Sequence, residues 1–354
     1  MDGVGDYTIN LAREFARHGH NVTVVCRDYE NVCTNYEDID IYPVVEQWNR
    51  RAISTILYLI ELKQIDIVFL QYVPHGFHPK GLPFGLIQVM RRIKEEEIQV
   101  FTFFHEICVP MDKLTLKRIL LRYIMYYLTR RVLLYSDYIA TSIDWYSKKI
   151  ENICGCKKVP VIPIPSNVPM HFLSETEKIQ LHQLIAPNDE FIIGLFGKRN
   201  LDTCLEAVNE LVKSGRKIKL LSIGKTSLLD KSIDSNIIYQ TGILDINNLS
   251  RYLYVADCIV LPEPSSGCSF KSGSLMAALR AGKVVITSKG FMTDASLVNQ
   301  FNIIFADSAK DYERELLGIM EDRNKSVSIG MQAKLLVQDV DWLGTYRQYL
   351  KILQ

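Results

Sequence analysis

The sequence predicts two α/β domains in tandem, each a doubly wound parallel sheet. Its 354 residues are about twice the length of a typical domain, so each half can bury its own core. Short apolar segments alternate with segments of helical periodicity, the pattern of parallel strands covered by helices on both faces. Three prolines (163, 165 and 169) and a polar stretch up to residue 190 interrupt this alternation, so we expect the domain boundary between residues 168 and 188.

The first domain is expected to open with a helix. Apolar residues recur at helical spacing from residue 7 to 18, and Gly19 then ends the helix. Later helices are expected at 53–62, 82–94, 114–135 and 145–153. The apolar segments between them predict strands at 22–25, 65–70, 99–104, 138–141 and 159–164.

The second domain repeats the alternation. Strands are expected at 191–196, 218–223, 237–240, 258–261, 284–287 and 302–305, and helices at 201–213, 246–254 and 273–281. In sheets of this kind ligands bind at the carboxyl ends of the strands. We therefore expect the active site in a cleft that the two domains share.

Composition excludes several classes of protein. Lysine and arginine total 41 against 40 aspartates and glutamates, so the chain lacks the basic excess of a dedicated nucleic-acid binder. No apolar run approaches the roughly 20 residues that span a bilayer. The eight cysteines are scattered and no leader-like segment opens the chain, which predicts reduced thiols in a cytoplasmic protein. No set of ligands at metal-binding spacing follows Cys154 and Cys156, so no metal site is predicted.

A run of small residues precedes the expected helix at 273–281. Residues 266–274 would place free backbone N–H groups and the positive end of a helix dipole at its start, and Lys271 would add a full charge. Such an arrangement suits a phosphate. An ordinary loop with an N-cap fits the same residues equally well.

Two other groups lie where strands are expected to end. Lys198 and Arg199 follow strand 191–196 and His105 follows strand 99–104. Gly3 and Gly5 open the first helix and allow a ligand to approach the backbone. A solvated pair of cations and a structural histidine are the competing interpretations.

Six segments form a recognisable set in chain order: Asp2-Gly3-Val4-Gly5-Asp6-Tyr7-Thr8, His18-Gly19-His20-Asn21-Val22, Gln71-Tyr72-Val73-Pro74, Phe103-Phe104-His105-Glu106, Ile164-Pro165-Ser166-Asn167 and Ser274-Leu275-Met276-Ala277-Ala278-Leu279. Together they resemble glycosyltransferase family 4 over nearly the whole chain. Trp342 resembles the aromatic residue that opens the last helix of GT-B enzymes. The resemblance implies an N-terminal acceptor-side Rossmann-like domain of residues 1–168, on which helix 338–354 packs, and a nucleotide-sugar-binding Rossmann-like domain of residues 169–337.

The resemblance also implies an activity. It implies a hexosyltransferase that moves a sugar from a UDP- or GDP-sugar to a glycan or lipid-linked acceptor, with retention, in cell-surface polysaccharide or glycoconjugate synthesis. No cofactor and no protein-bound metal are expected. The residues expected to be catalytic are His105, Lys198, Arg199 and Lys271. Those expected to bind the donor are Gly3, Gly5, Gly242, Leu244, Glu263, Gly267, Ser269, Phe270, Ser272, Gly273 and Ser274, and those on the acceptor side are Gln71, Tyr72 and His75.

The chain departs from the family pattern in two places. The family commonly carries two glutamates eight positions apart, but here Ser269 and Ala277 stand in those positions, as in a subgroup that lacks the pair. Glu263 either replaces a sugar contact or only marks a turn before Pro264. The family's first strand precedes the glycine loop, yet the sequence begins at that loop, so the first sheet is expected to lack a central strand or to gain one from an upstream extension.

Two other functions are compatible with the same fold, and the membrane is a candidate partner. A nucleotide-sugar 2-epimerase would need converging acid–base groups, and an inactive partner or scaffold of the same fold would have lost donor chemistry. Basic and apolar residues interleave over 113–131, which fits either a solvated basic helix face or peripheral contact with the inner face of the cell membrane.

Overall fold

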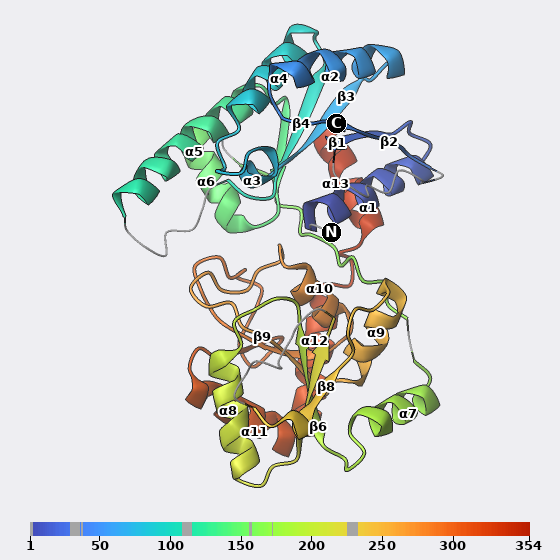
Figure 1. The fold of residues 1–354 in the computed structure, drawn as a ribbon, viewed down its shortest axis with the longest axis vertical. Coiled ribbons are helices and arrows are strands. Elements are labelled where there is room, and N and C mark those ends of the chain that lie inside the picture. Colours follow the sequence, from blue (N-terminus) through green and yellow to red (C-terminus); the bar gives the residue numbers. More distant parts are fainter. Residues whose placement is uncertain are drawn as a thin grey trace. The chain divides into compact units, whose positions relative to one another are not determined.

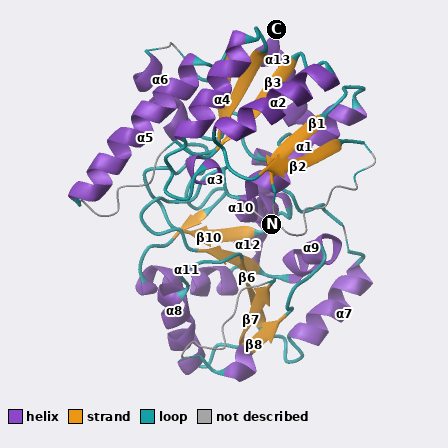
Figure 2. Cartoon of the chain, turned by 45° about the horizontal axis from the view of Figure 1, so that its top comes forward, coloured by secondary structure: helices purple, strands orange, loops and turns teal. Residues whose placement is uncertain are grey.

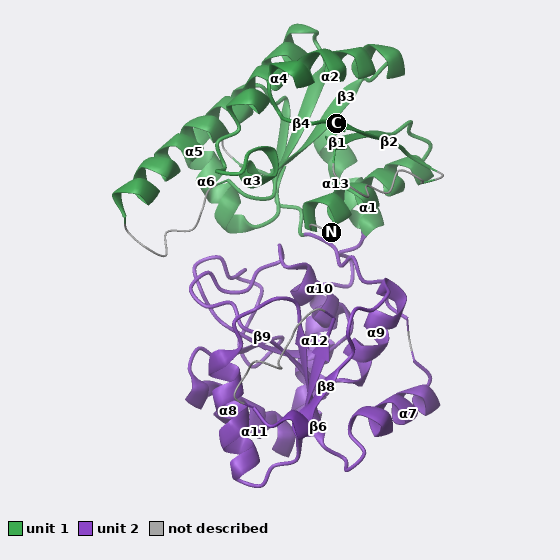
Figure 3. Ribbon diagram, viewed as in Figure 1, with its two compact units in different colours: residues 1–163, 342–354 green, residues 164–341 purple. Residues whose placement is uncertain are grey.

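The computed structural model describes residues 3–28, 36, 38–107, 115–155, 158–171, 173–224 and 233–354. The chain divides into two compact units (Figure 3). Unit 1 comprises residues 1–163 and 342–354, and unit 2 comprises residues 164–341. Asp2, Cys33, Cys108, Lys113, residue 114 and Cys156, which enter the sequence interpretation, lie outside the described residues.

Unit 1 contains five strands in two parallel sheets among its described residues (Figures 1 and 2). Its elements are α1 (Gly3–Arg17), β1 (Thr23–Arg27), β2 (Asp40–Val45), α2 (Arg50–Lys63), β3 (Ile67–Tyr72), α3 (Pro74–Phe77), α4 (Phe84–Glu95), β4 (Gln99–Phe104), α5 (Leu116–Leu134), β5 (Tyr138–Thr141), α6 (Asp144–Cys154) and α13 (Trp342–Leu353). One sheet pairs β1 with β2, and the other has the order β3-β4-β5. Helices α2, α4, α5 and α6 pack in series, while α13 packs on α1.

The last helix completes the core of unit 1. Tyr349 of α13 is fully buried and stacks on Phe101 of β4 with ring centroids 4.6 Å apart. Its hydroxyl lies 3.2 Å from the hydroxyl of Tyr7 on α1, which is also fully buried. Phe15 of α1 packs against Phe69 of β3 at 5.2 Å. Residues more than 300 positions apart in the sequence therefore share one aromatic core.

Unit 2 is a single six-stranded parallel sheet with helices on both faces. Its elements are α7 (Glu175–Ile185), β6 (Phe191–Phe196), α8 (Asp202–Lys213), β7 (Ile218–Ile223), the 3₁₀ turn Ser235–Ile237, β8 (Ile238–Gln240), α9 (Ile246–Val255), β9 (Cys258–Leu261), α10 (Gly273–Arg280), β10 (Val284–Thr287), β11 (Ile304–Phe305), α11 (Ala309–Glu321) and α12 (Arg323–Leu336). The strand order is β11-β10-β9-β6-β7-β8. Along β6, Ile192 joins the core beneath α9 and α10, while Ile193 joins the core beneath α8 and α11. Burial of both faces is the property that the apolar runs predicted.

The two units have the same strand order apart from one position. Strands β2 and β1 correspond to β8 and β7, and β3, β4 and β5 correspond to β9, β10 and β11. No described strand of unit 1 corresponds to β6, which pairs with both β7 and β9 at the centre of its sheet. This is the position at which the family pattern predicts a strand ahead of the glycine loop.

Several expected elements need correction. Residues 159–164 form no strand but only one bridge, from Val161 to Thr141, because prolines at 160 and 163 lack the N–H groups that a strand ladder requires. The strand expected at 302–305 is only Ile304–Phe305. Cys26, Cys204, Cys258 and Cys268 are free thiols as expected, but Cys154 is disulfide-bonded. None of the described helices combines the length and the apolar character needed to cross a membrane.

Candidate functional site

The candidate site of unit 2 lies at the carboxyl ends of β6 and β9. These strands are hydrogen-bonded neighbours and run parallel, so Lys198 and Arg199 after β6 and Glu263 after β9 emerge at the same edge of the sheet. The turn after β6 depends on Gly197, whose φ of +84° favours glycine. A Cβ there would also lie 2.9 Å from Oγ of Ser274, so the turn packs closely on the start of α10.

Arg199 is the centre of this group. Its guanidinium forms an ion pair with Glu263 through Nη1 and donates from Nη2 to Oγ of Ser272 at 3.2 Å. The side chain is 10 % exposed, and its Nε is buried without a hydrogen-bond partner among the described residues. Burial lowers the pKa of Arg199 to about 10, so the side chain stays protonated at neutral pH. A protonated donor therefore remains unsatisfied at the carboxyl end of the central strand.

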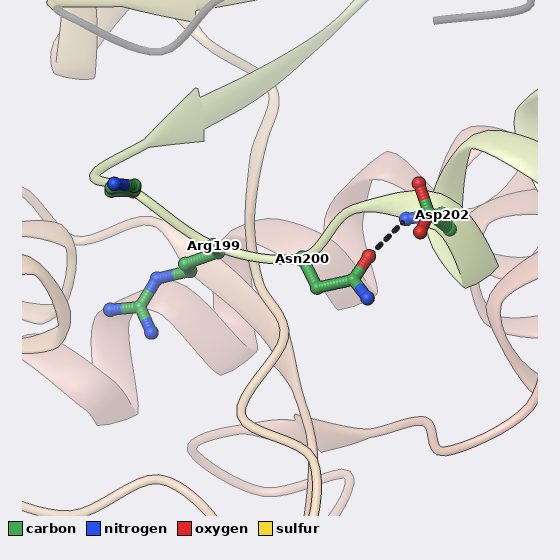
Figure 4. A pocket seen from close by; sticks show the side chains of 4 residues that line it. Arg199, Asn200 and Asp202 are labelled. Atoms are coloured by element: carbon green, nitrogen blue, oxygen red, sulfur yellow. Dashed lines mark hydrogen bonds between the residues drawn. The ribbon is translucent and has the colours of Figure 1, made fainter.

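An open pocket of about 520 Å³ adjoins this arginine. It is lined by Lys198, Arg199, Asn200 and Asp202, on the segment that joins β6 to α8 (Figure 4). Oδ1 of Asn200 accepts a hydrogen bond from the backbone N–H of Asp202 at 2.9 Å, which fixes the turn into the helix. Lys198 is exposed and Arg199 is nearly buried, so the two adjacent cations differ in mobility and in solvation.

The segment between β9 and α10 is held from several directions. Gly267 packs so closely on Gly290 that a Cβ would lie 2.2 Å from its backbone nitrogen, and the φ of Gly267 is +75°. The backbone N–H of Phe270 donates to Oδ2 of Asp294 at 2.7 Å, and its carbonyl accepts from Ile164 N–H at 3.1 Å. Ser269 is buried within this segment. The loop is therefore a rigid platform ahead of α10.

Helix α10 begins at this platform. Ser272 is its N-cap, and Oγ accepts a hydrogen bond from Leu275 N–H at 3.4 Å. Gly273 and Ser274 occupy the first two helical positions, and Lys271 is half-buried just before the cap. Since the same hydroxyl accepts from Arg199, the N-terminus of α10 and the arginine share one polar group.

Gly242 and Leu244 lie apart from this group. They follow β8, the edge strand, which is two strand spacings or about 10 Å from β6. Gly242 is exposed and has a φ of +67°, while Leu244 packs against the core on the α9 and α10 face.

A second group of expected residues lies in unit 1, around His105. This residue directly follows β4 and is 5 % exposed. Its Nε2 lies 3.0 Å from Oε1 of Gln71, so that nitrogen is the donor. The rings of Tyr7 and Phe103 contact the imidazole at centroid distances of 4.8 and 4.7 Å. Burial lowers the pKa of His105 to about 3, which keeps the ring neutral over the physiological range.

The remaining residues of unit 1 are spread around this histidine. Gln71 and Tyr72 end β3, and the Tyr72 carbonyl accepts from His105 N–H at 3.0 Å. Gly3 and Gly5 are exposed in the first turn of α1. His75 is exposed in α3, where its ring lies against Gly81.

Four side chains that support these groups were not predicted. Asn200 and Asp202 line the pocket, Asp294 holds Phe270, and Tyr349 reaches the Tyr7 hydroxyl from the last helix. Only Asn200 and Asp202 could have been predicted from the sequence. An asparagine two residues before an aspartate at the start of a helix is typical of a turn that the asparagine side chain stabilises. Within the ranges that the structure describes, no cluster of histidine, cysteine or carboxylate side chains has the arrangement of a metal site.

Residues 1–163 match the family described as Glycosyltransferase Family 4, whereas no curated protein sequence has significant similarity to the chain. Sucrose-phosphate synthase from Thermosynechococcus elongatus superposes with a TM-score of 0.74 at 13% identity, covering 99% of this chain and 93% of that one. Anabaena Alr3699/HepE in complex with UDP gives 0.70 at 12% identity, with coverages of 99% and 96%. A UDP-N-acetylglucosamine 2-epimerase gives 0.60 at 11% identity, with coverages of 98% and 92%.

At identities this low, the structural likeness establishes the fold, a GT-B arrangement of two Rossmann-like units. The family match covers the N-terminal segment that carries the glycine loop and His105. The N-terminal segment therefore matches glycosyltransferase family 4, as the sequence motifs indicated, and the whole chain shares the GT-B fold.

Proposed function

We propose that the chain is a family 4 glycosyltransferase that moves a hexosyl group from a UDP- or GDP-sugar to a glycan or lipid-linked acceptor, with retention of configuration. The pathway we propose is cell-surface polysaccharide or glycoconjugate synthesis at the cytoplasmic side of the membrane. One observation carries the proposal: Arg199 is nearly buried and protonated beside an open pocket and the N-terminus of α10, and its Nε has no hydrogen-bond partner among the described residues.

The proposed task of this group is to stabilise the leaving diphosphate. Cleavage of the sugar–phosphate bond develops negative charge on the nucleotide, and preorganised donors stabilise that charge most effectively where water is excluded. Arg199 supplies a fixed cation, Lys198 a mobile one, and Gly273 and Ser274 lie at the positive end of a helix dipole. Lys271 adds a further charge next to the cap. These groups supply the positive charge without a cofactor or metal, so the proposed reaction is metal-independent.

The donor class is supported by the structural neighbours. The Anabaena protein has been solved with UDP and with UDP-glucose, on the same fold as this chain. We therefore assign nucleotide-sugar binding to unit 2. The remaining donor contacts would come from Gly242 and Leu244 at the base, Gly267, Ser269 and Phe270 at the phosphates, and Glu263 at the sugar.

Unit 1 is assigned to the acceptor side, with Gln71, Tyr72 and His75 as contacts and with Gly3 and Gly5 near the substrate. His105 would act there as a neutral hydrogen-bonding group toward the transferred sugar. Its pKa of about 3 leaves it unprotonated at neutral pH, which suits orientation better than proton transfer. For this reason we favour a transferase over a 2-epimerase, although an epimerase shares the fold.

Calorimetric titration of UDP and GDP, without divalent metal, tests the donor site. We expect the wild type to bind one of them, and Lys198→Ala and Arg199→Lys to weaken that binding about tenfold to a hundredfold, because each removes a charge-assisted contact. Lys213→Ala is the matched control, since this α8 lysine is 72% exposed on the same unit. Thermal unfolding of each variant separates lost binding from lost folding.

The outcomes distinguish an enzyme from an inactive relative. Binding that the two site variants lose and the control retains would support the donor site. If the wild type bound neither nucleotide, the transferase proposal would fail and a scaffold role would replace it.

A further inference from the structure

Helix α5 carries a stripe of exposed apolar side chains. Leu116, Leu120, Tyr123, Tyr127 and Leu134 are between 58% and 84% exposed. Their spacing of three, four or seven residues places them on one face of the helix. Figure 1 shows α5 as the long helix at the margin of unit 1. We call these five residues the α5 stripe.

The stripe lies opposite the face that packs on unit 1. Met125, Leu128, Thr129 and Val132 are buried, and Thr129 donates to the Met125 carbonyl at 2.9 Å. At about 100° per residue, the stripe is centred about 180° from these buried residues. The helix is therefore apolar on two opposite faces, and the described residues of unit 1 cover only one of them.

Basic side chains accompany the stripe without acidic ones. Residues 115–136 contain no aspartate or glutamate but include Lys117, Arg122, Arg130 and Arg131. None of these four forms an ion pair with a carboxylate in the described part of the chain. By contrast, Arg91 and Arg92 of α4 both pair with Glu95. The charges of these four side chains are thus left for a partner.

Two of these arginines are ordered along the helix. Arg122 donates to the Tyr126 hydroxyl at 2.7 Å, and Arg131 donates to the Tyr135 hydroxyl at 2.6 Å. Each guanidinium also lies 5.2 Å from the centre of that tyrosine ring. Tyrosine and arginine side chains combine an apolar body with a polar end, the property that suits the boundary between lipid tails and headgroups.

We propose that α5 binds the surface of an anionic lipid bilayer, with the stripe among the acyl chains near the headgroups and the cations on lipid phosphates. An apolar helix face bordered by lysine and arginine is the signature of such interfacial binding. A second copy of the chain is disfavoured as occupant, since it would bring two unneutralised basic faces together. This surface extends the proposed function toward a membrane-borne acceptor but does not depend on donor binding. Residues 113 and 114 of the interval 113–131 lie outside the described residues.

Vesicle co-sedimentation of the full chain tests this inference. We expect the protein to pellet with phosphatidylcholine vesicles that contain phosphatidylglycerol, but not with phosphatidylcholine alone. Binding should fall as ionic strength rises from about 0.05 M to about 0.5 M, because salt screens the lipid charge.

Two variants separate the apolar and charged contributions. Leu120→Gln/Tyr123→Gln should weaken vesicle binding about tenfold or more, because two exposed apolar anchors are removed. Lys117→Gln/Arg130→Gln should weaken it and flatten its salt dependence. The matched control is Tyr58→Gln/Leu62→Gln on α2, where a tyrosine and a leucine four residues apart are 61% and 55% exposed. This control should bind vesicles as the wild type does.

Each contrary result would overturn the inference. The first is that the protein does not sediment with anionic vesicles. The second is that it binds neutral vesicles equally well, and the third is that the α2 control loses as much binding as Leu120→Gln/Tyr123→Gln does. Self-association in light scattering that Leu120→Gln/Tyr123→Gln abolishes would instead assign the stripe to a second copy. UDP titration of that variant, expected to match the wild type, keeps failure here distinct from failure of the donor site.

Discussion

At the scale of single residues, Arg199 shows how this site is preorganised. Burying a guanidinium is unfavourable unless its donors are paired, and Glu263 and Ser272 satisfy two of its nitrogens. The carboxylate that makes burial tolerable also places a negative charge where we propose that a diphosphate binds. Glu263 is therefore expected to oppose nucleotide binding while it holds the arginine in place.

This opposition predicts the sign of a mutational effect. Glu263→Gln removes the negative charge but keeps a side chain that can accept a hydrogen bond from Arg199, so UDP should bind several-fold more tightly. Calorimetry of the variant measures this. Glu210→Gln on α8, an exposed carboxylate of the same unit, should leave UDP affinity unchanged. Weaker binding by Glu263→Gln would mean that orienting Arg199 outweighs the repulsion.

His105 provides a second test at this scale. Its pKa falls from 6.5 to about 3 on burial, so the unfolded chain binds a proton at pH values where the folded chain does not. The stability linked to the neutral His105 ring is therefore fully present above about pH 6.5, and it is lost as the pH falls toward 3. Lowering the pH from 7 to 5 should therefore reduce the free energy of unfolding by about 2 kcal/mol through this residue alone.

Denaturant unfolding of the wild type and of His105→Gln at pH 7 and pH 5 measures that loss. The variant should lose about 2 kcal/mol less than the wild type over this range, because glutamine does not titrate. Histidine NMR resonances supply an independent readout, and the His105 imidazole should show no titration between pH 5 and pH 8. A midpoint near 6.5 would show that the ring is solvated rather than buried.

At the scale of secondary-structure elements, the sequence predicted strands most accurately where both faces of the strand are buried. Strands such as β6 and β9 are apolar on both faces, so every residue of them contributes to the signal. Helices α8, α9 and α10 were predicted to within a residue or two. Strand β2 was missed because Pro43 and exposed positions break its pattern. Helix α7 was read as a polar linker, since Ile185 is its only buried residue.

The site was predictable to a similar extent. Parallel strands deliver their carboxyl ends to one edge, so order along the chain was enough to bring Arg199, Glu263 and Ser272 to the same edge of unit 2. The pairing itself was not predictable. Glu263 and Arg199 are 64 positions apart in the sequence, and Asp294, which accepts from the Phe270 N–H, is 24 positions from that residue. Such contacts are set by tertiary structure and leave no local pattern.

At the scale of the whole molecule, the chain leaves unit 1 at residue 163 and returns to it at residue 342. The return is anchored by α13, whose Tyr349 stacks on Phe101 and approaches the hydroxyl of Tyr7. Unit 2 is one continuous segment, and none of its described residues belongs to the ring contacts of that aromatic core. Stability of unit 1 should therefore depend on the last helix, while nucleotide binding should depend on unit 2.

Tyr349→Ala tests this division. Removing a fully buried aromatic ring should destabilise unit 1 by about 3–5 kcal/mol. Hydrogen exchange followed by mass spectrometry should show faster exchange in α1, β3 and β4 but unchanged protection in β6, β7 and β9. Affinity for UDP should also stay unchanged, because Lys198, Arg199 and Ser272 all belong to unit 2.

The control for this variant is Tyr58→Ala, a tyrosine of unit 1 that is 61% exposed and should change stability by no more than about 0.5 kcal/mol. Equal acceleration of exchange in both units of Tyr349→Ala would contradict the prediction. It would mean that the two units unfold as one cooperative block. The helix that returns to unit 1 would then stabilise the proposed nucleotide site as well.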